Sequence, residues 1–335
     1  LLIRHGYNWD RLFHPTRTVL TIHNLGYQGI FGADTAEDVG LGPKSYLLHQ
    51  DDLRAGRINY LKHGILYADA ITTVSPTYAR EICTDELGMG LQDVLRARGG
   101  AVHGILNGVD YDEWDPRNDR YLPLRYGPDD LEGKAALKRQ FLQRMGLTVD
   151  PRIPLAGIVS RMVSQKGFDL MFDSLPRVLA SRELALAVLG SGEEKYESFF
   201  ARLQSEFPGR VAFRRGYDNE LAHWIEAASD LFLMPSLYEP CGLNQMYSLR
   251  YGAVPVVRAT GGLADSVEPY DPATGQGTGI VFRDFTPAAL EAALHTALDL
   301  HAAPDHWSRL MRNGMSRDFS WKRQGARYVE LYESL

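Results

Sequence analysis

The stretch Leu231-Phe-Leu-Met-Pro-Ser-Leu-Tyr-Glu-Pro-Cys-Gly-Leu-Asn-Gln-Met-Tyr-Ser-Leu-Arg-Tyr-Gly252 contains three successive structural signals. Its first four residues are apolar and predict a short buried strand. A turn with two prolines follows, and a segment with nearly helical apolar spacing begins near Gly242. The apolar positions of this helix are Leu243, Met246, Leu249 and Tyr251.

The turn in this stretch holds the first candidate site. Glu239 follows the carboxyl end of the predicted strand, where open α/β sheets bind ligands. The backbone N–H groups of Leu243 and Asn244 would lie at a free helix N-terminus, which favours phosphate. The alternative is an ordinary strand-to-helix corner with Glu239 as a solvated charge. The stretch alone supports both interpretations equally.

Composition limits the classes of protein that the chain can belong to. A length of 335 residues predicts two domains. There is no long apolar run, so no membrane span is expected. The formal net charge of −6 gives no electrostatic footprint for nucleic acid. Cys83 and Cys241 are too few for a disulfide framework or a cysteine-rich zinc site, and we expect a cytoplasmic protein.

Residues 151–320 alternate regularly between strand and helix patterns. This alternation predicts a parallel sheet with right-handed crossovers, as in a Rossmann-like domain. The predicted strands are 155–160, 184–189, 211–214, 231–234, 254–257 and 279–282. The predicted helices are 168–180, 193–207, 220–228, 243–251, 263–267 and 287–301.

Residues 1–150 form a second predicted domain with fewer elements. Strands are expected at 18–23, 70–75 and 102–107, with helices at 53–67 and 76–86. Three strands are about half of the five or six of a doubly wound sheet. We therefore expect this Rossmann-like domain to lack its N-terminal part.

Two cations flank the first strand-to-helix turn of the second domain. Arg161 follows the strand and Lys166 begins the next helical segment, so both can neutralise a diphosphate. Two surface cations are the commoner case, but these share the predicted edge of Glu239. A dinucleotide or ATP site is disfavoured, because Gly190-Ser-Gly192 lacks a third glycine and no Walker loop is present.

Further loops end at ligand-binding edges. Tyr217 could stack on a base, and Thr260-Gly261-Gly262 permits close backbone approach. In the first domain, His23 and Asn24 end a strand and would face an interdomain cleft if the two domains stack. Asp110 and Asp112 could hold a metal or form a turn. No metal is required, since the two cations can offset phosphate charge.

Several motifs occur in an order that resembles bacterial glycogen synthases and plant starch synthases, over essentially the whole chain. They are His23-Asn24, Asn107-Gly-Val-Asp110, Arg161 with Lys166-Gly167, Glu239-Pro-Cys-Gly242, Thr260-Gly-Gly-Leu263 and Phe319-Ser-Trp321. The resemblance implies a GT-B fold, two Rossmann-like domains with the active site in the cleft between them. It also implies retaining transfer of glucose from ADP-glucose to the non-reducing end of an α-1,4-glucan, without metal or other cofactor.

The resemblance also implies roles for individual residues. Arg161 and Lys166 would hold the diphosphate, Tyr217 the adenine, and Glu239 the glucose hydroxyls. His23 and Asn107 would line the sugar from the other domain, and Asn24 beside His23 is a substrate-binding candidate. Residues 321–335 would cross back to the N-terminal domain. The remaining substrate-binding candidates are Cys241, Gly242, Leu243, Asn244, Thr260, Gly261 and Gly262.

The chain also departs from the family pattern. The Lys-x-Gly-Gly loop that members carry near their start is absent, and Asn244 occupies a position where Thr is frequent. Two other functions therefore stay open: transfer from another donor such as UDP-glucose, and non-catalytic binding of a glucan or nucleotide. A glycosidase-like double displacement is not supported, because no second carboxylate is evidently placed for it.

Overall fold

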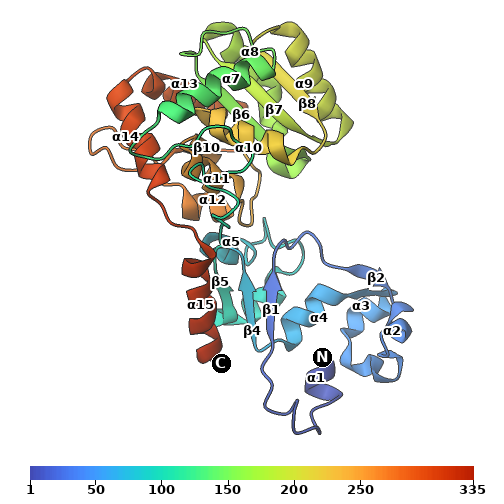
Figure 1. Ribbon diagram of the computed structural model, residues 1–335. Helices are drawn as coiled ribbons and strands as arrows, with labels where there is room; N and C mark the ends of the chain where they lie inside the picture. Colours follow the sequence, from blue (N-terminus) through green and yellow to red (C-terminus); the bar gives the residue numbers. More distant parts are fainter. The chain divides into compact units, whose positions relative to one another are not determined.

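A computed structural model describes residues 1–335 and divides into two compact units (Figure 1). Unit 1 comprises Leu1–Leu106 and Ala326–Leu335, and unit 2 comprises Asn107–Gly325. Composition had suggested a boundary near residue 150 instead. The difference arises because helix α7 (Glu132–Arg144) buries Leu137 and Phe141 in the core of unit 2.

Unit 2 is built on a six-stranded parallel sheet of order β11-β10-β9-β6-β7-β8. All six strands of the predicted Rossmann-like domain are present. Parallel strands of this kind carry ligand sites at their carboxyl ends. The strands are β6 (Leu155–Met162), β7 (Ala185–Gly192), β8 (Val211–Arg215), β9 (Leu231–Met234), β10 (Val254–Arg258) and β11 (Ile280–Phe282).

Helices cover both faces of this sheet, so alternate strand residues enter different cores. Leu186 and Val188 of β7 pack in one core, and Ala187 and Leu189 pack in the other. The first core receives side chains from α8 (Met171–Ser181), α9 (Glu194–Glu206), α13 (Pro287–His301) and α14 (Pro304–Met315). The second receives them from α7, α10 (Asn219–Ala228), α11 (Asn244–Tyr251) and α12 (Gly261–Ser266).

Unit 1 contains a three-stranded parallel sheet of order β1-β4-β5. Its strands are β1 (Val19–Ile22), β4 (Ala70–Thr73) and β5 (Val102–Gly104). A separate antiparallel pair joins β2 (Ile30–Gly32) to β3 (Arg57–Asn59). The helices are α1 (Leu2–His5), α2 (Thr35–Asp38), α3 (Gln50–Arg54), α4 (Tyr60–Tyr67), α5 (Pro76–Glu81), α6 (Gln92–Ala97) and, from Ala326 onward, α15 (Trp321–Glu333).

The single helix predicted over 53–67 is wrong. Gly56, with φ of +72°, ends α3, and β3 follows because it pairs with β2. Helix α4 then starts afresh, because the Asn59 side chain accepts a hydrogen bond from the Lys62 N–H at 2.9 Å. Capping chemistry therefore divided a segment whose apolar spacing looked continuous.

Helix α7 had no counterpart in the sequence prediction, because two of its buried positions are lysines. Lys134 Nζ donates to the carbonyl oxygens of Ala227 and Ser229 at 2.9 and 2.8 Å. Lys138 Nζ donates to the Asp230 carboxylate at 2.6 Å. These charges interrupt the apolar stripe that marks an amphipathic helix. No helix of the chain is both long enough and apolar enough to cross a membrane.

Candidate active site

Glu239 lies in the turn after β9, and it is buried. Only 4% of the surface of Glu239 is exposed to solvent. The Glu239 Oε2 atom accepts hydrogen bonds from Lys166 Nζ at 2.7 Å and from Ser236 Oγ at 2.9 Å. A buried carboxylate needs such partners, because desolvation disfavours an isolated charge. The interpretation of Glu239 as a solvated surface charge is therefore wrong.

Lys166 reaches Glu239 because the loop after β6 runs along the loop after β9. The Leu237 N–H donates to the Gln165 carbonyl oxygen at 2.9 Å. Gly167 then adopts a φ of +73°, and a Cβ atom there would collide with the Pro235 carbonyl oxygen. Only glycine fits this approach. The Lys166-Gly167 pair thus brings an ammonium group to the carboxyl edge of the sheet.

The Thr260-Gly-Gly segment packs against the backbone of the Glu239 turn. A Cβ atom on Gly261 would collide with the Glu239 carbonyl oxygen, and one on Gly262 with the Cys241 carbonyl oxygen. The Gly262 N–H donates to the Glu239 carbonyl at 3.0 Å. Thr260, which is buried, precedes α12 at its N-cap position. These glycines therefore fix the main chain on both sides of the Glu239 side chain.

Helix α11 begins beside this turn. Leu243 occupies its N-cap position, and the Asn244 side chain donates from Nδ2 to the Val159 carbonyl oxygen at 2.6 Å. Gly242 has a φ of +68°. Burial raises the pKa of the Cys241 thiol to about 12, and a hydrogen bond with the Asn107 backbone acts in the opposite direction. Burial therefore favours the neutral thiol of Cys241 over the thiolate.

A cavity of about 280 Å³ opens at the same edge, among the ends of β6 and β7 and the starts of α10 and α11. Arg161, Tyr217 and Asn244 line it, together with Gly190. Tyr217 is 90% exposed as a residue, which leaves its side chain accessible to a ligand. The structure thus brings three of the predicted nucleotide-binding residues to one cavity, and the Glu239–Lys166 pair is not part of its lining.

His23 and Asn24 belong to unit 1. They follow β1, where His23 is exposed and Asn24 forms a turn by accepting the Gly26 N–H on Oδ1 at 2.9 Å. They occupy the carboxyl edge of the β1-β4-β5 sheet, as expected. Asn107 was expected in the same domain as His23, but it is the first residue of unit 2.

Two residues near the Glu239 turn escaped the sequence analysis. Ser236 is buried and donates to the Glu239 carboxylate. Arg258, at the carboxyl end of β10, donates from Nη1 to the Leu237 carbonyl oxygen at 2.6 Å. Its place directly after an apolar strand is the same signal that identified Arg161. Both residues hold the turn in shape.

The Asp110–Asp112 pair forms a turn. The Asp112 N–H donates to Asp110 Oδ1 at 3.0 Å, which is an Asx turn. No cluster of three or more His, Cys, Asp or Glu side chains is arranged to hold a metal ion. Of the two interpretations of this motif, a metal site or a turn, the structure therefore supports the turn.

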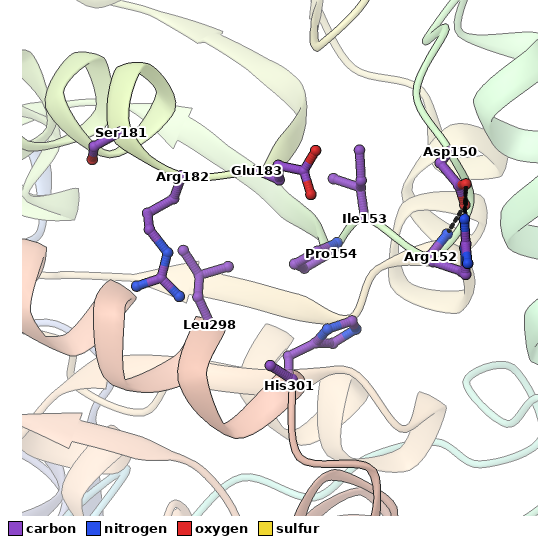
Figure 2. A pocket seen from close by; sticks show the side chains of 10 residues that line it. Asp150, Arg152, Ile153, Pro154, Ser181, Arg182, Glu183, Leu298 and His301 are labelled. Carbon is purple, nitrogen blue, oxygen red and sulfur yellow. Dashed lines mark hydrogen bonds and ion pairs between the residues drawn. The ribbon is translucent and has the colours of Figure 1, made fainter.

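A second cavity, of about 690 Å³, lies at the opposite edge of the sheet of unit 2 (Figure 2). Pro154 and Glu183 line it just before β6 and β7, together with His301 at the end of α13. Its cations are engaged with neighbouring acids: Arg152 with Asp150 and Arg182 with Asp299, both at 2.7 Å. The predicted site residues all lie elsewhere.

Comparison with known proteins identifies relatives over the whole chain. The family description "Starch synthase catalytic domain" matches residues 1–97, and "Glycosyl transferases group 1" matches residues 143–313. The glycogen synthase of Anaeromyxobacter dehalogenans is 49% identical over 334 residues, which cover 100% of this chain and 69% of the relative. That of Koribacter versatilis is 48% identical over 333 residues, covering 99% and 68%.

Solved structures agree. The catalytic domain of starch synthase IV from Arabidopsis thaliana, bound to ADP and acarbose, superposes with a TM-score of 0.90 at 35% identity. The match covers 98% of this chain and 69% of that one. Sucrose-phosphate synthase from Thermosynechococcus elongatus shares the fold, with a TM-score of 0.62 at 18% identity, covering 94% and 67%. The predicted GT-B fold class is confirmed, and the chain belongs to the glycogen and starch synthase family of glycosyltransferases.

Proposed function

We propose that this chain transfers glucose from ADP-glucose to the non-reducing end of an α-1,4-glucan, with retention of the anomeric configuration. The observation that carries the proposal is the buried Glu239–Lys166 pair beside the cavity lined by Arg161 and Tyr217. This arrangement offers a carboxylate for sugar hydroxyls and cations for a diphosphate at one sheet edge. The relative from Arabidopsis thaliana was solved with ADP and acarbose, which supports the same ligand classes here.

In this proposal the cations act on the leaving group. Negative charge grows on ADP as the glycosidic bond breaks, and Arg161 and Lys166 would stabilise it. The N-terminus of α11, at Leu243 and Asn244, would add backbone N–H groups to the same phosphates. Lys166 is held in place before the reaction by its hydrogen bond to Glu239, so little reorganisation of this cation is needed when charge develops.

Glu239 would bind glucose hydroxyls rather than attack the sugar. Its Oε2 atom is already engaged by Lys166 and Ser236, which leaves Oε1 for the substrate. Sequence analysis identified no second carboxylate evidently placed as a partner for Glu239, so we do not propose a double displacement with two acids. A same-face substitution, assisted by the departing phosphate oxygen, fits these groups better. We assign His23, Asn24 and Asn107 to the glucose and Tyr217 to the adenine.

The compartment is part of the proposal. Cys83 and Cys241 are both free thiols, which agrees with the reducing cytoplasm. We propose that the chain binds ADP-glucose and an α-1,4-glucan in the cytoplasm.

Transfer of labelled glucose to a maltooligosaccharide tests the proposal, with ADP-glucose and UDP-glucose compared as donors. Because the glycogen synthase of Anaeromyxobacter dehalogenans is longer than this chain, it is assayed beside the chain as a positive control. Transfer from ADP-glucose is expected. A preference for UDP-glucose would show that UDP-glucose, and not ADP-glucose, is the donor. Nucleotide binding in calorimetry without transfer from either donor would favour a non-catalytic binding protein.

A further inference from the structure

The cavity at the carboxyl edge of unit 2 depends on the positions of two helices. Asp218 and Ala222 contribute from the start of α10, and Asn244 contributes from the start of α11. A nucleotide that touches both helix starts requires a fixed separation between them. The side chains of Trp114 and Asp119 contact both helices beyond their first residues.

Trp114 lies between these helices as a flat spacer. Its ring stacks on His223 of α10, with centroids 3.7 Å apart and planes 13° apart. It also stacks on Tyr247 of α11, with centroids 4.0 Å apart and planes 2° apart. His223 directly follows the cavity residue Ala222, and Tyr247 lies three residues after Asn244. Three nearly parallel rings therefore connect the two helices just behind the cavity.

Asp119 makes a second connection between the same helices. Its Oδ2 atom accepts a hydrogen bond from Tyr251 of α11 at 2.6 Å and contacts His223 Nδ1 of α10 at 2.7 Å. Both Asp119 and His223 are buried. Burial strengthens such contacts and makes their loss costly. The segment that holds Trp114 and Asp119 thus contacts α10 and α11 at two separate levels.

We infer that Trp114 is a positioning residue of the nucleotide site, and that with Asp119 it sets the separation of α10 and α11. The inference rests on the proposed function, since it concerns the site that would bind ADP. A displacement of about 1 Å in a positioned group can reduce a reaction rate on the order of a hundredfold. Removal of the spacer is therefore expected to impair the cavity even though Trp114 does not line it.

The test replaces Trp114 in the full chain and measures ADP affinity by calorimetry, glucose transfer and melting temperature. Trp114→Leu keeps an apolar side chain but removes the stack, and Trp114→Phe restores a flat ring. The matched control is Trp307→Leu in α14, a tryptophan that also contacts a histidine, His301, but lies in the other core. All binding measurements are made well below the melting temperature of each variant.

Trp114→Leu should lower ADP affinity and transfer on the order of tenfold or more, and Trp114→Phe should recover much of both. Trp307→Leu should lower the melting temperature and leave ADP affinity unchanged. Unchanged ADP affinity in folded Trp114→Leu, or an equal loss in Trp307→Leu, would overturn the inference. If Trp114→Leu does not fold, Tyr251→Phe decides, because it removes only the hydroxyl that bonds Asp119 and lies 3.4 Å from His223 Nδ1. Reduced ADP affinity supports the inference, and wild-type affinity overturns it.

Failure of the proposed function has a different signature. If the wild-type chain binds UDP instead of ADP, the same variants are measured with UDP, and the inference is still tested. A wild-type chain that binds no nucleotide would remove the proposed function and the inference together, before any variant is compared.

Discussion

Replacing Glu239 by Gln separates a role in the reaction from a role in holding the turn. Gln keeps the length of the side chain, and its carbonyl oxygen can still accept from Lys166 and Ser236. The two bonds then lose their charge-assisted character, so we expect a loss of about 1–3 kcal/mol in the free energy of unfolding. For a domain of the size of unit 2, each kcal/mol corresponds to a fall of about 2–4 °C in melting temperature.

The reaction should suffer more than the fold. If Glu239 binds glucose hydroxyls more strongly in the transition state, Glu239→Gln should slow transfer on the order of a hundredfold or more. ADP affinity should change little, because other groups bind the phosphates. Glu239→Asp is less informative, because a shortening of about 1.5 Å would also break the contacts with Lys166 and Ser236. A merely structural carboxylate would therefore be sensitive to length as well.

The same strand provides a matched control at its other end. Asp230 directly precedes β9 and pairs with Lys138 Nζ at 2.6 Å, as Glu239 follows β9 and pairs with Lys166 Nζ at 2.7 Å. Asp230→Asn should cost similar stability without slowing transfer. Transfer rates, ADP affinity and melting temperature are measured on both variants. A Glu239→Gln variant with the wild-type rate, or equal slowing by Asp230→Asn, would refute the reasoning.

Three further predictions concern charge, acid stability and the extent of unit 2. Arg161→Ala should weaken ADP binding roughly tenfold to a hundredfold, because it removes one charge-assisted hydrogen bond. Arg177→Ala, on the surface, should leave ADP binding unchanged, and calorimetry compares the two variants. Burial raises the pKa of Asp119, but hydrogen bonds from His223 and Tyr251 outweigh it and hold that pKa below the ordinary value of an aspartate. The stabilisation by the Asp119 carboxylate should therefore be present above the ordinary aspartate pKa and be lost as the pH falls through the lower pKa of the folded state. Urea unfolding of wild type and Asp119→Asn should accordingly converge in acid. The fragment 107–325 should give a cooperative unfolding transition, and 151–325, which lacks α7, should be less stable or molten.

The alternation of strands and helices in unit 2 was predictable because its signals are local. An apolar run such as Leu231–Met234 predicts a buried strand whichever strands lie beside it in the sheet. The end of the run also marks the carboxyl end of the strand. The positions of Glu239, Arg161 and Lys166 at one edge of a parallel sheet followed from this order alone. Burial of Lys134 and Lys138 was not predictable, since a charged side chain normally indicates an exposed helix face.

Tertiary structure alone decided which of these residues touch. Lys166 and Glu239 are 73 residues apart in sequence, and they meet because β9 lies beside β6 in the sheet, although two strands separate them along the chain. Trp114 lies between two helices because strand order brings α10 and α11 together around it. Local sequence determines the type of each element, but contacts between distant side chains depend on strand order, which arises only when the whole sheet buries both of its faces.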